Sequence, residues 1–161
     1  VHCIVQDTST AANYNIWYAA GGEHWGNSAD ENGATYMGDG LWKSTDNGVT
    51  WTKTSMTFTQ GASTQSGPFF LERFDHPFDF VQKIAVNPTN GHVYVGCHRR
   101  LMRSTDGGST WQVVLVGNAA GIAVNGTVDV AITGTGRVIA AVNGANEDNA
   151  LRGVWSSTTG N

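Results

Sequence analysis

The sequence predicts an all-β fold assembled from repeated groups of strands. The eight-residue phrase STDNGVTW at 44–51 returns as STDGGSTW at 104–111, each time after a short apolar run. Short β-branched runs bounded by Gly, Asn, Pro or Thr recur along the chain, and no segment keeps a helical period. Together these observations indicate one array of similar β units.

Upstream of the phrases, three segments are expected to form two strands joined by a turn. They are IVQDTSTAANYNIWYAA at 4–20, IAVNPTNGHVYVG at 84–96 and VAITGTGRVIAA at 130–141. Each unit then has an inner strand, a second strand, a third strand before the phrase and a fourth after it.

The expected units cover about 1–56, 80–116 and 126–161, with an insertion at 57–79 between the first two. The third unit is incomplete. Its segment GVWSSTTGN aligns with GLWKST of the first unit but has Thr159 where the repeat has aspartate.

The repeated phrase has the chemistry of a hairpin turn. Glycine accepts positive φ, aspartate bonds the amides of its own turn, and tryptophan covers the hairpin as it opens the next strand. We therefore expect structural roles, not catalytic ones, for all the defining residues. These are Ser44, Asp46, Gly48, Thr50 and Trp51 in the first copy and Ser104, Asp106, Gly108, Thr110 and Trp111 in the second.

The pattern Ser-x-Asp-x-Gly-x-Thr-Trp resembles the Asp-box of sialidases, xyloglucanases, sortilin-type receptors and photosystem assembly factors. This resemblance implies a partial β-propeller in which each unit is a four-stranded antiparallel blade, the last one truncated. A closed ring needs about four to eight blades, so about three cannot close one. We expect the chain to be a piece of a larger secreted bacterial protein, or to complete a ring with other copies.

Long insertions are the candidate functional regions, because variable loops carry function in repeat proteins. The resemblance implies that those at 21–40, 57–80 and 143–153 share the face opposite the Asp-box turns. The middle insertion holds all six phenylalanines, interleaved with charged residues. Phe78 and Phe80 lead into a strand and favour a small core. For Phe69, Phe70 and Phe74, a core and an aromatic platform for a sugar or peptide both remain open.

The candidate ligand-binding residues share these insertions. They are Glu23, His24, Trp25, Phe69, Phe70, Glu72, Arg73, Asp75 and His76. The expected ligand is a polysaccharide or another protein. The spacing of histidine and carboxylates matches no calcium loop or zinc pattern, so neither a metal nor another cofactor is expected.

Two of the families that this pattern resembles, the sialidases and the xyloglucanases, are enzymes. The Phe/Tyr-Arg-Ile-Pro signature of sialidases is absent. The sequence between the two boxes resembles xyloglucanases more closely. These enzymes use one carboxylate as general acid and another as base. Glu72 and Asp75 are the candidates here, although no family motif surrounds them. The sequence favours a binding or scaffold module, with a glycoside hydrolase fragment as the alternative.

Composition narrows the partners and the compartment. A net charge of −4, with no basic run beyond Arg99 and Arg100, argues against a nucleic-acid partner. No apolar stretch reaches the length of a membrane span. The scarcity of lysine favours a secreted or cell-surface protein. Cys3 and Cys97 either pair in an oxidising compartment or stay as small buried residues.

Overall fold

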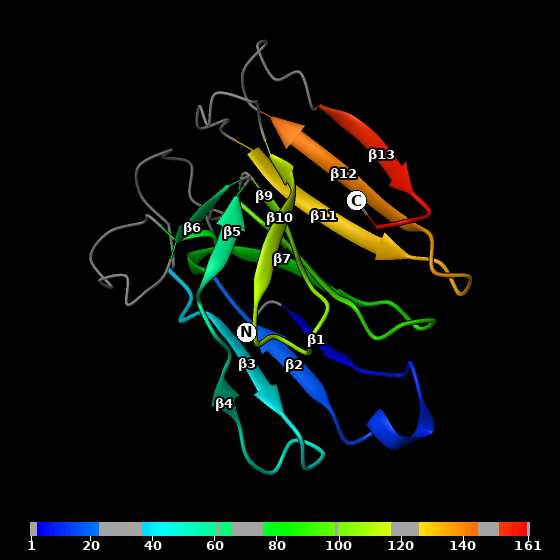
Figure 1. The fold of residues 1–161 in the computed structure, drawn as a ribbon. Coiled ribbons are helices and arrows are strands. Elements are labelled where there is room, and N and C mark those ends of the chain that lie inside the picture. The colour runs from blue at the N-terminus through cyan, green and yellow to red at the C-terminus, as the bar shows by residue number, and fades with distance from the viewer. Residues whose placement is uncertain are drawn as a thin grey trace, which may run out of the picture.

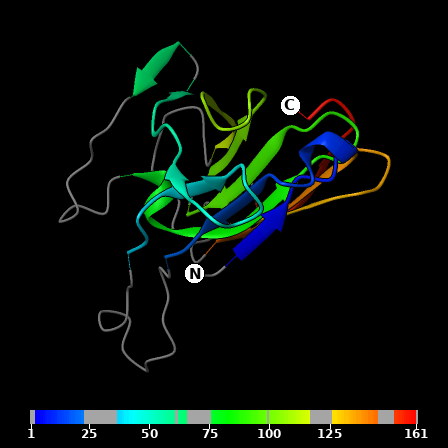
Figure 2. The same cartoon turned by 90° about the horizontal axis from the view of Figure 1, so that it is seen from below.

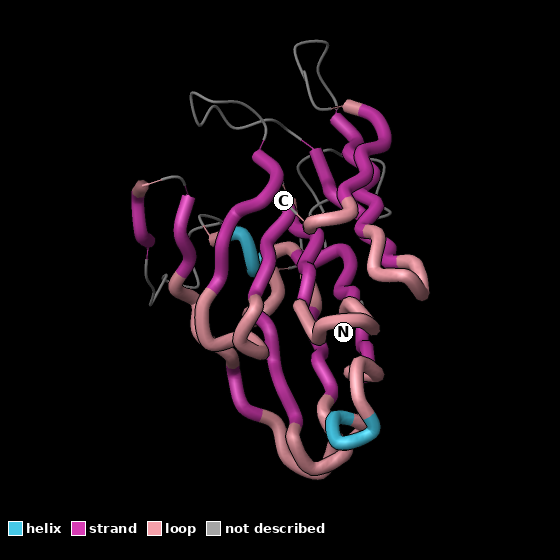
Figure 3. The backbone as a smooth tube through the Cα atoms, turned by 45° about the vertical axis from the view of Figure 1, so that its right-hand side comes forward, coloured by secondary structure: helices cyan, strands magenta, loops and turns pink. Residues whose placement is uncertain are grey.

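Three β-sheets follow one another along the chain in the computed structural model, which describes residues 3–22, 37–60, 62–65, 76–98, 100–116, 126–144 and 152–160 (Figure 1). The helical residues in these ranges are two single 3-10 turns, Ala11–Asn13 and Pro77–Asp79, which lie far apart in the molecule (Figure 3). The all-β prediction is therefore confirmed.

The first sheet is an antiparallel meander of four strands in sequence order. It contains β1 (Cys3–Gln6), β2 (Trp17–Ala20), β3 (Leu41–Ser44) and β4 (Thr52–Lys53). Ile4 of β1 lies opposite Ala19 of β2, which lies opposite Trp42 of β3. This is the blade pattern expected from the repeat.

The second sheet repeats the meander with longer strands. Its blade strands are β7 (Val81–Val86), β8 (Val93–Cys97), β9 (Arg100–Ser104) and β10 (Trp111–Val116). Neighbouring strands are antiparallel throughout this part of the sheet.

Two further strands extend the second sheet beyond its blade. The hairpin of β5 (Phe58–Gln60) and β6 (Ser63–Gln65) comes from the insertion between the first two units. It adds to the outer edge of β10 in parallel, with Phe58 opposite Trp111. Figure 2 shows it at the periphery of the molecule. No local pattern in the sequence predicts this pairing.

The third sheet has three antiparallel strands among the described residues. They are β11 (Gly126–Ile132), β12 (Val138–Gly144) and β13 (Gly153–Ser157). The three sheets do not close on themselves.

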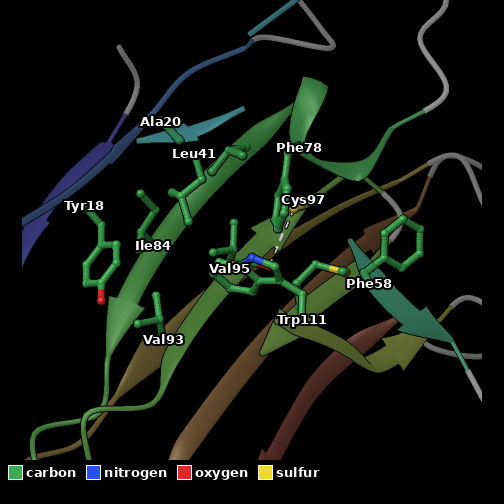
Figure 4. Packing of buried hydrophobic residues seen from close by; sticks show 12 residues of the cluster. Tyr18, Ala20, Leu41, Phe58, Phe78, Ile84, Val93, Val95, Cys97 and Trp111 are labelled. Atoms are coloured by element: carbon green, nitrogen blue, oxygen red, sulfur yellow. Dashed lines mark hydrogen bonds between the residues drawn. The ribbon is translucent and has the colours of Figure 1, made fainter. Parts of the chain in front are cut away.

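Two hydrophobic cores lie between successive sheets. The first joins Tyr18 and Leu41 of the first sheet to Val95, Met102 and Trp111 of the second (Figure 4). The second core joins the other face of the second sheet to the third, through residues that include Tyr94, Leu101, Val128, Val130, Val138 and Ala140. The second blade is thus packed on both faces, because side chains alternate between the two faces along each strand.

Phe78 and Phe80 are buried, so the prediction that these two phenylalanines form a core is confirmed. Phe58 is buried as well and belongs to the first core. The rings of Phe78 and Trp111 meet edge to face, with centroids 5.0 Å apart. The insertion is therefore tied to the second blade through aromatic packing.

A polar contact is repeated at both junctions between blades. The ammonium of Lys43 donates to the carbonyl oxygen of Gly107 at 2.8 Å, and the guanidinium of Arg103 donates to that of Gly160 at 3.0 Å. Lys43 and Arg103 each stand directly before the serine of their own turn. A basic side chain of one blade thus holds the turn of the next blade.

Both cysteines are free thiols. Burial raises the pKa of Cys3, and burial together with the neighbouring Cys3 raises the pKa of Cys97 well above its usual value. A raised pKa keeps both sulfurs protonated and poorly nucleophilic. Of the two alternatives left open by the sequence, the structure has unpaired thiols, with Cys97 buried and Cys3 half-buried.

Candidate functional site

The two repeated phrases form the same turn at the end of β3 and of β9. Two consecutive residues have positive φ in each copy, Asn47 and Gly48 in the first and Gly107 and Gly108 in the second. Glycine and asparagine are the residues that adopt this conformation at low cost. The turn needs two such residues in succession, which explains why each phrase has Asn-Gly or Gly-Gly at its centre.

Each aspartate caps its turn with several hydrogen bonds. Asp46 accepts from the hydroxyl of Ser44 at 2.8 Å, and from the amide and hydroxyl of Thr50 at 2.8 and 2.5 Å. Asp106 accepts from the same groups of Ser104 and Thr110, between 2.6 and 2.9 Å. These partners of both carboxylates lie within the turn, which is the geometry expected of a structural cap.

The hydrogen bonds favour the charged form of both carboxylates. The hydroxyl and amide of Thr50 lower the pKa of Asp46 to about 2. Burial opposes ionisation of Asp106, but the bonds from Thr110 and Ser104 outweigh it and lower the pKa of Asp106. Because both folded-state values lie below the ordinary 3.8, the stabilisation is present above that pH.

We therefore expect the stability of the protein to fall as the pH drops from about 4 to about 2, through the folded pKa of Asp46. Urea midpoints at several pH values across this range measure the effect. Replacing both turn aspartates with asparagine should lower the midpoint at pH 7 and flatten its decline in acid. Asp39→Asn, at an exposed carboxylate outside both turns, should leave the acid decline in place. An unchanged pH profile in the double variant would contradict this account.

The ends of the first two insertions meet at the opposite end of the strands from these turns. The amide of Gly38 donates to the carbonyl oxygen of Asp79 at 2.7 Å, and the amide of Val81 donates to that of Gly21 at 3.2 Å. A side chain at Gly22 would collide with the backbone of Asp79. These contacts bring the described ends of 21–40 and 57–80 side by side.

His76 is the one ligand-binding candidate that the structure describes, and it is buried at 3% exposure. Its Nδ1 accepts from the amide of Phe78 at 3.1 Å, and its Nε2 lies 2.9 Å from the carbonyl oxygen of Met56. A nitrogen that accepts carries no proton, so Nε2 is the protonated atom and donates to Met56. The expectation of a ligand contact is corrected here, because both ring nitrogens are used inside the protein.

The other candidates lie outside the described residues. They are Glu23, His24, Trp25, Phe69, Phe70, Glu72, Arg73 and Asp75. Their proposed roles therefore remain predictions. Within the described ranges, no group of three or more His, Cys, Asp or Glu side chains is arranged to hold a metal ion.

Two residues at this end of the strands were not among the sequence candidates. Arg100 places its guanidinium 5.3 Å from the centre of the Phe58 ring, a cation–π contact. His98 forms a bridge with Thr127 of the third sheet and meets the ring of Phe80 edge to face. Arg100 thus connects the second blade to the insertion, and His98 connects it to both the insertion and the third blade. The sequence CHRR gives no local signal for these long-range contacts.

A polar pocket of about 320 Å³ lies at the turn end, between the first two blades. Its walls include Asp7, Tyr18, Lys43 and Asp106. Burial and the charges of Asp7 and Asp106 raise the pKa of Tyr18 to about 12, so its hydroxyl stays protonated. The pocket is at the other end of the strands from the insertions, and it contains none of the predicted ligand-binding residues.

Two four-stranded blades, a third sheet of three described strands, the cores between them and the repeated turns define an open segment of a β-propeller. A solved structure of an ancestral GH74 enzyme matches 98% of this chain with a TM-score of 0.57, at 21% identity, and this chain covers 19% of that one. At such identity the likeness shows the fold alone.

In sequence, the chain is similar to xyloglucanase Xgh74A of Acetivibrio thermocellus. The two are 36% identical over 93 residues, which cover 50% of this chain and 10% of the xyloglucanase. The chain thus spans about a tenth of the length of the curated relative it matches. No protein-family model matches it. Within the described ranges, no helix has the length and apolar character needed to cross a membrane.

Proposed function

We propose that this chain is a propeller segment of a secreted or cell-surface glycoside hydrolase that acts on a xyloglucan-like polysaccharide. The observation that carries the proposal is the 36% identity to xyloglucanase Xgh74A over 93 residues. This similarity favours the hydrolase alternative over a free-standing scaffold. Further blades of the same protein, or other copies, would complete the ring.

The role of the segment within that protein is to bind the polysaccharide with its insertion face. The hydrogen bonds from Gly38 to Asp79 and from Val81 to Gly21 support this role, because they join the ends of two insertions. Those insertions contain Trp25, Phe69 and Phe70 as candidate stacking surfaces for sugar rings. Glu72 and Asp75 are the candidate acid and base.

The proposal is tested by assaying the intact protein that carries this segment on soluble xyloglucan. Reducing-end release measures cleavage, and affinity electrophoresis measures binding. If Glu72 or Asp75 acts as general acid or base, Glu72→Gln or Asp75→Asn should lower turnover by about 100-fold or more and leave binding intact. Changing Trp25, Phe69 and Phe70 to alanine should weaken binding without lowering the melting temperature.

A binding module without catalytic carboxylates is the second candidate, favoured by the phenylalanine-rich composition of the middle insertion. In that case the aromatic variant loses binding, while the carboxylate variants cleave as well as the parent or the parent does not cleave at all. A parent that neither binds nor cleaves xyloglucan would overturn both candidates.

A further inference from the structure

The polar pocket between the first two blades has a tyrosine hydroxyl in its wall. Tyr18 is 1% exposed, and its hydroxyl makes no hydrogen bond to the residues that the structure describes. A Cβ atom added at Gly107, another wall residue, would lie 3.5 Å from this hydroxyl. Figure 4 shows the hydroxyl at the margin of the first core, pointing away from Leu41 and Ala20. Because buried polar groups are normally hydrogen-bonded, the hydroxyl is available to a ligand in the pocket.

The equivalent tyrosine at the next junction has a partner. Tyr94 lies opposite Arg103 in the second blade. This is the position that Tyr18 has in the first blade, opposite Lys43. The hydroxyl of Tyr94 donates to the carbonyl oxygen of Gly160 at 3.4 Å. Within the described ranges, the tyrosine hydroxyl is thus satisfied at the second junction and left open at the first.

Asp7 and Asn87 are a second matched pair at the two junctions. Asp7 directly follows β1, and Asn87 directly follows β7. The Oδ1 of each accepts from the amide and the hydroxyl two positions later, which belong to Ser9 and Thr89 respectively. The Nδ2 of Asn87 then donates to the carbonyl oxygen of Gly136 in the third blade at 3.1 Å. The atom of Asp7 that corresponds to this donor is Oδ2, which is an acceptor.

Gly91 is the counterpart of Gly136 at the first junction. The two glycines stand two positions before β8 and β12 respectively. A Cβ atom added at Gly91 would lie 3.1 Å from the hydroxyl of Ser9 and 4.0 Å from the Oδ2 of Asp7. One added at Gly136 would lie 2.5 Å from the hydroxyl of Thr89. The first junction therefore has a carboxylate oxygen and a carbonyl where the second has a donor and a carbonyl, and two acceptors need a donor from elsewhere to join them.

The charges of the pocket wall are negative in sum. Asp7 is 4% exposed, and its Oδ2 accepts from the Nδ2 of Asn13 at 3.1 Å, which leaves that oxygen a further lone pair. The charges of Asp7 and Asp106 both raise the pKa of Tyr18, so the electrostatic potential at its hydroxyl is negative. Lys43 brings one positive charge to the wall against these two carboxylates. A buried carboxylate of this kind favours a cation beside it.

We infer that this pocket binds a primary ammonium group on a short chain, whose N–H groups donate to the Oδ2 of Asp7, the carbonyl oxygen of Gly91 and the hydroxyl oxygen of Tyr18. An ammonium group combines several N–H donors with a positive charge, and it lacks an acceptor, so it suits a wall of acceptors. Calcium takes about six to eight oxygen ligands, whereas the described residues offer no group of three His, Cys, Asp or Glu side chains. The volume of about 320 Å³ leaves room for a carbon chain beside Ile16. This inference goes beyond the proposed function, because the pocket lies at the opposite end of the strands from the insertions.

Titration of the full chain with butylammonium, followed through the amide resonances of Gly91 and Gly107, tests the site. The shifts should saturate. Butan-1-ol, which lacks the charge, and tetramethylammonium, which lacks N–H groups, should each bind about tenfold more weakly or worse. Shifts that do not saturate, or equal binding by either control compound, would overturn the inference. Calcium chloride that shifts these resonances at lower concentration than butylammonium would also overturn it, because the site would then hold a metal ion.

A second ligand separates the two sources of such an ammonium group. The amide of N-acetyl-lysine carries it on a peptide unit. Tighter binding of this compound than of butylammonium would identify the ligand as a lysine side chain of another protein, and weaker binding would identify it as a free amine. The ammonium site is supported in both cases.

Asp7→Asn gives the first junction the pattern of the second, because the new amide can donate to the carbonyl oxygen of Gly91. Its affinity for butylammonium should fall about tenfold or more. Tyr18→Phe should weaken binding about fivefold, whereas Tyr94→Phe, at the satisfied tyrosine, should leave it unchanged. Melting temperatures establish that each variant is folded. Retained affinity in folded Asp7→Asn would overturn the inference, and the control compounds decide on the unchanged chain if that variant does not fold.

Discussion

Replacing Trp111 with alanine is expected to lower the free energy of unfolding by about 3–5 kcal/mol, whereas the same change at Trp51 should cost less than half as much. The two tryptophans hold the same position in the repeated phrase. Trp111 is buried in the first core against Phe78, so its removal leaves a cavity between two blades. Trp51 is partly exposed and lies over its own turn, where its indole donates to the carbonyl oxygen of Gly48 at 3.0 Å.

Equilibrium unfolding in urea measures both costs. A phenylalanine series provides the control, because the indole N–H of Trp111 is buried without a hydrogen-bond partner among the described residues. Trp111→Phe keeps a ring and removes an unsatisfied donor, and should recover much of the loss caused by alanine. Trp51→Phe, in contrast, removes the hydrogen bond that the Trp51 indole donates to the carbonyl oxygen of Gly48. Equal losses for the two alanine variants would contradict the different burial of the two sites.

The contrast between the tryptophans shows what the sequence could and could not predict. The turn chemistry of the phrase is local, because Ser, Asp, Gly and Thr bond one another within seven residues. Local patterns of this kind can be read directly, and so can strands bounded by turn residues. Which tryptophan is buried depends on whether another blade and its insertion pack against it. That is a long-range property with no local signal.

The β5–β6 hairpin is a second example of this limit. Phe58 and Trp111 lie opposite each other in parallel strands although 53 positions separate them in the sequence. The insertion was expected to connect blades, and its short polar runs gave no reason to expect strands that extend one. Its candidate binding residues were chosen by composition, which identifies chemistry but gives no positions in space.

His76 shows how such a candidate can have another role. A histidine among carboxylates and phenylalanines suggested a ligand contact, and the residue instead begins the 3-10 helix Pro77–Asp79. Asp79 completes the cap by accepting from the amide of His76 at 3.0 Å. The second partner, the carbonyl of Met56, lies 20 positions earlier. This histidine therefore joins the two ends of the insertion to each other.

Replacing His76 with alanine is expected to destabilise the protein by about 2–4 kcal/mol, because it leaves the amide of Phe78 and the carbonyl of Met56 without their partner. It also removes a ring that packs against Phe58 and Phe78, with centroids 5.5 and 5.3 Å apart. Urea unfolding measures the total cost.

Two matched variants separate the hydrogen bonds of His76 from its packing. His76→Asn can still accept from the amide of Phe78, as asparagine does at helix starts, and should recover part of the stability. His76→Phe keeps an aromatic ring and makes neither hydrogen bond. If phenylalanine were as stable as histidine, packing alone would fix the insertion. If asparagine recovers more than phenylalanine, the cap is what holds the insertion ends together. The candidate binding residues at 69–75 lie between those ends. Xyloglucan binding by the proposed hydrolase should then follow the order of stability, and His76→Asn should weaken it less than His76→Phe does.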